Sequence, residues 1–198
     1  MPRYAETYDL SEEKERIDKR LDTLADRTSE IEQQMDELGE DEDLNQGQLH
    51  EYREIVQEGN QLEQMYAGVQ WALNPDGDQE PIEEVTLGSL TAGEYAEVGD
   101  KLQAAKQQRS GWGWGTNPDL DNARRNMFAA ACLQDASFLA EEDPDFETKI
   151  RVVTDLAPAF IHWLEKKGDE LTTPEVEGNG FRKRVEERRT VSTPKSRT

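Results

Sequence analysis

Apolar residues recur at helical spacing over the first fifth of the chain. Charged side chains fill most of the positions between them, as in a heptad repeat whose a and d positions form a seam. We expect a helix that is capped by Asp9 or Ser11 and ends at Gly39. The predicted seam consists of Leu10, Ile17, Leu21, Leu24, Thr28, Ile31, Met35 and Leu38.

A second apolar stripe predicts a helix from about Gln48 to Leu73. The polar stretch 39–47 is short, so residues 10–73 predict an antiparallel helical hairpin, or coiled coil. Half of the seam of such a hairpin would be exposed. We therefore expect it to form a homo-oligomer or to bind a helical partner, and an intramolecular hairpin is the alternative. The predicted contact residues are Leu21, Leu24, Ile31 and Met35.

Residues 74–81 predict a hinge. Their alternating acids resemble a calcium loop, but the glycine stands one position early and Val85 replaces the closing acid, which favours a solvated turn. Segment 82–90 predicts a short extended stretch. Thr91 and Glu94 then form a capping-box pattern, which predicts a helix that presents Tyr95 and Val98 on one side.

Two tryptophans alternate with glycines in the next segment, 110–116. Trp112 and Trp114 each need a surface to bury against, so this stretch is either a partner-docking loop or a loop that folds back on its own domain. Helices are expected from Asn117 to about 140 and from Asp145 to about 156. A third helix follows a break at Pro158 and ends with Gly168 as its C-cap, so that residues 82–168 form a compact helical domain.

The predicted fold is therefore mainly α. We expect a flexible lead at 1–9, the arm at 10–73, the hinge at 74–81, the helical domain at 82–168 and a polar, basic tail at 169–198. The tail either folds back on the acidic body, binds an acidic partner or stays solvated. Its candidate contact residues are Arg182, Lys183, Arg184, Arg188 and Arg189.

The net charge of −21 limits the partners that this chain is expected to bind. Such a charge disfavours nucleic acid as a partner, and two explanations compete for it: adaptation to molar salt, or a binding surface for a basic partner. The single cysteine, Cys132, lies in an apolar run and is expected to be structural. No apolar stretch approaches the length of a membrane span and no leader is evident, so we expect the chain in the cytoplasm or in a particle assembled there.

No catalytic or cofactor-binding motif stands out. The two histidines, His50 and His162, lie far apart in sequence and lack neighbours at metal-ligand spacing. We therefore expect no enzyme activity, no metal and no cofactor.

The stretch Glu84–Leu102 combines a short extended piece, the turn at Leu90–Glu94 and a helix. It resembles the opening of tail assembly chaperones of tailed viruses, and the helical region that follows is similar in size and order, over residues 84–167 in all. The resemblance implies a non-enzymatic assembly factor that binds tape-measure and tail-tube proteins in the host cytoplasm. With the acidic composition, it implies a virus of halophilic archaea.

Two further functions stay open. One is a structural component of the virion, a head–tail connector or tail protein that oligomerises through the hairpin. The other is a host coiled-coil adaptor. The three functions differ in where the protein is found. A chaperone leaves the finished particle, a structural protein is retained in it, and a host adaptor is present without infection.

Overall fold

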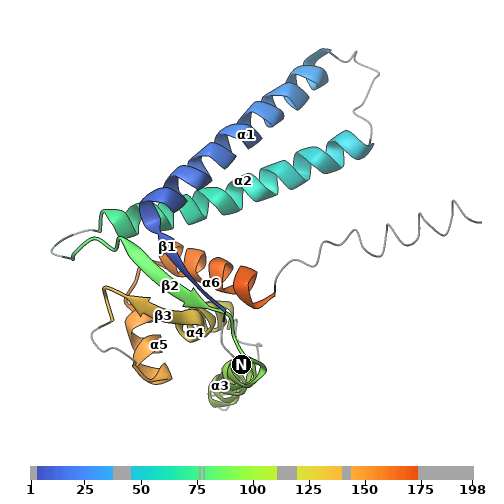
Figure 1. Cartoon of the computed structure of the whole chain (residues 1–198). Helices are drawn as coiled ribbons and strands as arrows, with labels where there is room; N and C mark the ends of the chain where they lie inside the picture. Colours follow the sequence, from blue (N-terminus) through green and yellow to red (C-terminus); the bar gives the residue numbers. More distant parts are fainter. Residues whose placement is uncertain are drawn as a thin grey trace, which may run out of the picture.

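The computed structural model describes residues 4–37, 46–75, 77, 79–110, 120–139 and 144–173. Within them the fold is mainly helical, as predicted, with a small antiparallel sheet (Figure 1). In chain order the elements are β1 (Ala5–Asp9), α1 (Leu10–Glu37), α2 (Gln46–Leu73), β2 (Glu84–Gly88), α3 (Ala92–Ser110), α4 (Asp121–Cys132), β3 (Leu133–Ala136), α5 (Phe146–Thr154) and α6 (Pro158–Thr172).

Helices α1 and α2 form the predicted antiparallel hairpin, which projects from the rest of the molecule (Figure 1). Leu24 and Ile31 of the seam are buried inside it. Two charged pairs, one heptad apart, link α1 to α2 along one side of the hairpin. Arg20 donates two hydrogen bonds of 2.7 and 3.0 Å to Glu58, and Arg27 donates one of 2.7 Å to Glu51. The seam and these charged pairs therefore hold the two helices together within one chain.

The sheet has the order β1-β2-β3, with both pairs antiparallel. Tyr8, Val85, Leu87 and Leu133 point to its buried face, while Thr7 and Thr86 share a hydrogen bond on the solvated side. Two expectations were wrong here. Residues 5–9 are an edge strand and not a flexible lead, and residues 133–136 are a strand and not the end of a helix. Both strands are very short and are stabilised by pairing with β2, which lies far away in the sequence.

One hydrophobic core joins the sheet, the C-terminal half of α2, α4 and α6. Trp163 of α6 lies at its centre, stacked on Phe160 and edge-on to Tyr8 at centroid distances of 5.6 Å each. Met65 and Val69 of α2 belong to the same cluster. The predicted hinge at 74–81 therefore does not separate two cores, because the base of the arm is part of the main core.

Two glycines allow helices to approach closely. A Cβ at Gly68 would lie 2.3 Å from the Ala159 carbonyl oxygen, where α2 meets the start of α6. A Cβ at Gly168 would lie 2.5 Å from the Cys132 sulfur. Gly168 was expected to be the C-cap of the last helix, but α6 continues to Thr172. Its role is the close approach of α6 to α4.

Several helix termini follow the sequence signals. Asp9 caps α1 through its Oδ1, which accepts hydrogen bonds from the backbone amides of Ser11 and Glu12. The Thr91–Glu94 capping box is formed in both directions, at 2.8 and 3.3 Å. Pro158 was expected to interrupt the helical segments, and it occupies the first turn of α6, where its missing amide costs no helical hydrogen bond.

Candidate interaction surface

The four seam residues predicted to bind a partner lie along the arm. Leu24 and Ile31 are buried, with Ile31 0% exposed, and Leu21 is half-buried against the main core. Met35 is 43% exposed. The inner part of the seam therefore packs against α2 of the same chain. This corrects the expectation that Leu24 and Ile31 meet a partner, because reaching them would require the hairpin to open.

The outer surface of the arm offers other contact points. Met35 on α1 and Val56 on α2 are large apolar side chains that are 43% and 39% exposed. Away from the arm, Tyr4 and Tyr95 are also exposed. A partner that binds the closed arm would meet such outward-facing residues and the acidic side chains around them.

Seven residues predicted to contact partners lie outside the described residues. They are Trp112, Trp114, Arg182, Lys183, Arg184, Arg188 and Arg189.

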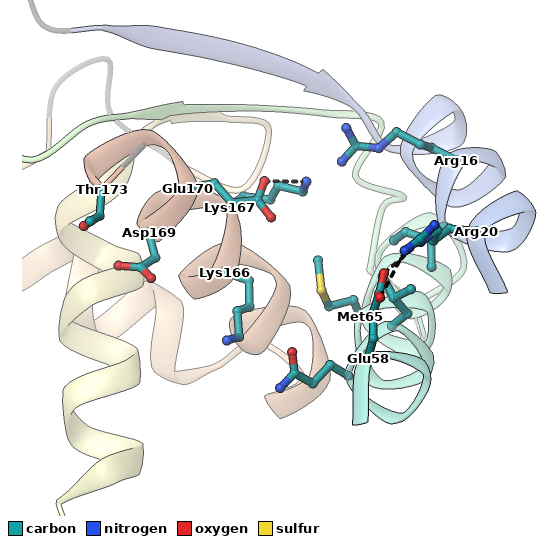
Figure 2. Close-up of a pocket in the computed structure, with 12 residues that line it drawn as sticks. Arg16, Arg20, Glu58, Met65, Lys166, Lys167, Asp169, Glu170 and Thr173 are labelled. Atoms are coloured by element: carbon teal, nitrogen blue, oxygen red, sulfur yellow. Dashed lines mark hydrogen bonds and ion pairs between the residues drawn. The ribbon is translucent and has the colours of Figure 1, made fainter. Parts of the chain in front are cut away.

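A cleft of about 580 Å³ lies beside the contact between α6 and the base of the arm (Figure 2). Met65 of α2 extends toward α6 (Figure 2), and Lys166 of α6 also lines the cleft. Its lining combines apolar side chains with both signs of charge. The residues are Arg16, Ile17, Arg20, Glu58, Gln61, Leu62, Met65, Lys166, Lys167, Asp169, Glu170 and Thr173.

A buried group of charges joins α1 to α6 beside this cleft. Lys167 is 3% exposed, and its Nζ lies 2.8 Å from Glu170 and 3.6 Å from Glu13, which is itself 7% exposed. Arg16 lies 2.8 Å from the same Glu13 carboxylate. Charges this far from water are stable only when they are paired. The group therefore ties the arm to the head, by which we mean the sheet together with α3, α4, α5 and α6.

Lys167 also lies over the ring of Tyr8, 5.7 Å from its centroid. Burial raises the pKa of the Tyr8 hydroxyl above its usual range, and the nearby carboxylates of Glu6, Glu170 and Glu13 add to this. The helix end expected at Gly168 would have placed Lys167 in the last turn, where burial is not predicted. A sequence signal was nevertheless present, since Phe160, Leu164 and Lys167 follow one another at spacings of four and three and so share one helical face.

His162 is a second buried ionisable residue. Neither of its ring nitrogens has a hydrogen-bond partner within the described part of the chain, although Nδ1 lies 3.6 Å from Glu165. Burial lowers the pKa of His162 below its usual 6.5, and the charge of Arg125 lowers it further. Arg125 is itself bound to Glu165 at 3.0 Å. The neutral imidazole is therefore the form that suits the fold.

The described residues contain no group of three or more histidine, cysteine or acidic side chains that is placed to hold a metal ion. Among the helices described, none combines the length and the hydropathy that a membrane span needs. Comparisons with models of protein families, with curated proteins and with solved structures found no match to this chain.

Proposed function

We propose that this chain is a non-enzymatic assembly factor that binds partner proteins along its projecting arm. The observation that carries the proposal is the closed hairpin, whose outer half extends away from the main core (Figure 1). Each arm helix has 28 residues, which corresponds to roughly 42 Å at 1.5 Å per residue. Much of that length does not contribute to the core of the head, and this leaves its outer faces available for a partner.

The arm suits a helical partner. Two antiparallel helices present grooves along which a further amphipathic helix can pack, as in a helical bundle. Exposed Met35 on α1 and Val56 on α2 supply apolar contacts on the arm, and a methionine side chain adapts readily to irregular partner surfaces. The partner is expected to carry basic residues, because α1 and α2 bear more acidic than basic side chains.

The narrower form of the proposal is a tail assembly chaperone of a tailed virus of halophilic archaea. It is supported by the resemblance over residues 84–167 and by the acidic composition. In this role the chain would keep a long helical tape-measure protein soluble in the host cytoplasm until tube subunits assemble around it. A virion component, such as a connector or tail protein, is the second candidate, because a projecting arm also suits contacts between subunits of a ring.

The experiment is affinity capture from infected lysate at molar KCl, followed by mass spectrometry of the captured proteins. The test variant carries Met35→Glu and Val56→Glu. The control carries Ala96→Glu and Ala104→Glu, which make the same charge change at two exposed helical positions of α3. Wild type and control are expected to recover a tape-measure protein and tube subunits, and the arm variant is expected to lose them.

Equal recovery by the two variants would show that the arm is not the binding surface. Quantitation of this chain in purified particles then separates the two candidates. Absence from particles supports the chaperone, whereas a fixed number of copies per particle supports the structural role.

A further inference from the structure

The cleft between α6 and the arm has an apolar floor and a charged rim. Ile17, Leu62 and Met65 supply the apolar part, and Ile17 and Met65 are buried. Its volume of about 580 Å³ lies in the range of sites that bind small ligands or a few peptide side chains. The cleft can therefore hold a short segment with one apolar anchor.

The cations that line the cleft are not all neutralised. Both hydrogen bonds from Arg20 go to Glu58, and Lys167 is paired with Glu170 and Glu13. Lys166, by contrast, has no ion-pair partner within the described residues, and Arg16 uses one guanidinium nitrogen for Glu13. The rim therefore has donors available for an acidic segment, although the whole chain carries a charge of −21.

A segment of this chemistry follows directly in the chain. Thr173 lines the cleft and has left the helix, with φ −122° and ψ 71°. The next residues are Pro174, Glu175, Val176 and Glu177. Proline prevents continuation of the helix, and four extended residues reach about 13 Å.

In an extended chain, alternate side chains point to opposite sides. Glu175 and Glu177 would then share one side and Val176 would take the other. We propose that residues 174–177 of this chain occupy the cleft, with Val176 on the apolar floor and the two carboxylates at Lys166 and Arg16. The bound segment would cover the cleft at the base of the arm. This inference is independent of the proposed partner of the arm.

Disulfide trapping in the full chain tests the proposal. The test pair is Gln61→Cys with Val176→Cys, because Gln61 lines the cleft and cysteine keeps an apolar side chain at the anchor position. The control pair is Glu63→Cys with Val176→Cys. Glu63 is exposed on the same helix but about 200° away around its axis. The native Cys132 is buried and does not compete.

Both pairs are oxidised at the lowest KCl concentration at which circular dichroism shows a folded chain. The cleft pair is expected to form an intramolecular disulfide about tenfold faster than the control pair, because docking raises its effective concentration. Equal rates would overturn the proposal. Products that are mainly covalent dimers would overturn it as well, since they would assign the cleft to a second copy.

A charge swap tests the ion pairs independently. In the cleft pair, Glu177→Lys is expected to slow disulfide formation by about fivefold, and adding Lys166→Glu is expected to restore it. Glu187→Lys makes the same charge change farther along the chain and is expected to leave the rate unchanged. Slowing without restoration by Lys166→Glu would refute the contact between Glu177 and Lys166.

Discussion

The contact between α2 and α6 at Gly68 leads to a quantitative prediction about stability. Gly68→Ala would place its Cβ 2.3 Å from the Ala159 oxygen, 2.5 Å from the Ala159 carbonyl carbon and 2.7 Å from the Phe160 nitrogen. All three are backbone atoms, so no flexible side chain can turn away. The start of α6 would have to move by about 1 Å to reach ordinary van der Waals contact, and overpacking of this kind costs about 1–3 kcal/mol.

Gly59 provides a matched control on the same helix. A Cβ at Gly59 meets no atom within 4 Å among the described residues. Gly59→Ala is therefore expected to gain about 1 kcal/mol from helix propensity. Gly68→Ala obtains the same gain, but its clash with backbone at 2.3 Å lies at the severe end of overpacking, so we expect a net loss of about 2 kcal/mol. The two variants should differ by about 3 kcal/mol.

The assay is urea unfolding at constant molar KCl, followed by circular dichroism and tryptophan fluorescence. The base of the arm and the head share one core, so both probes should report a single transition. The midpoint should fall for Gly68→Ala and rise for Gly59→Ala, with little change in the slope m. If Gly68→Ala is as stable as wild type, α2 and α6 do not approach as closely as described.

Four further predictions concern the arm, the buried charges and the acidic surface. Ile31→Asp is expected to open the arm, because it places a charge at a fully buried position, and limited proteolysis between 38 and 45 should accelerate; unchanged cleavage would argue against a closed hairpin. Lys167→Ala should destabilise the chain by about 2–3 kcal/mol in urea unfolding, below the full cost of a broken buried pair because Arg16 still binds Glu13. Lys167→Met combined with Glu13→Gln should lose less, and an equal loss would show that the buried charges do not depend on each other. Because the pKa of His162 is lowered in the fold, the neutral imidazole contributes fully to stability above about pH 6.5, and this contribution is lost as the pH falls from there toward the lowered pKa. If the melting temperature of His162→Gln drops on acidification as much as that of wild type, His162 is not the cause. Lowering KCl from 1 M to about 0.1 M lengthens the Debye length from about 3 to about 10 Å and should loosen the fold if the acidity is halophilic, whereas melting curves that do not respond to salt would exclude that explanation.

Local signals in the sequence were sufficient for the helices and many of their ends. The apolar seam from Leu10 to Met35 predicts α1, because one side of a helix that packs on another must be apolar along its length. Thr91 with Glu94, and Pro158, mark helix starts because they satisfy or replace backbone amides within one turn. These interactions reach only three or four residues, so a single sequence contains both partners.

The tertiary structure alone decided which surfaces are free. The seam pattern is the same whether its partner is α2, a second copy or another protein, and only the packing of the chain shows that Ile31 is covered from within. Strands β1 and β3 are stabilised by hydrogen bonds to β2, at separations that local patterns do not encode. The burial of Gly168 and Lys167 also could not be predicted from local patterns. Their roles depend on Cys132 and on Glu13, which come close to them only when the chain has folded, because burial is a property of the packed molecule.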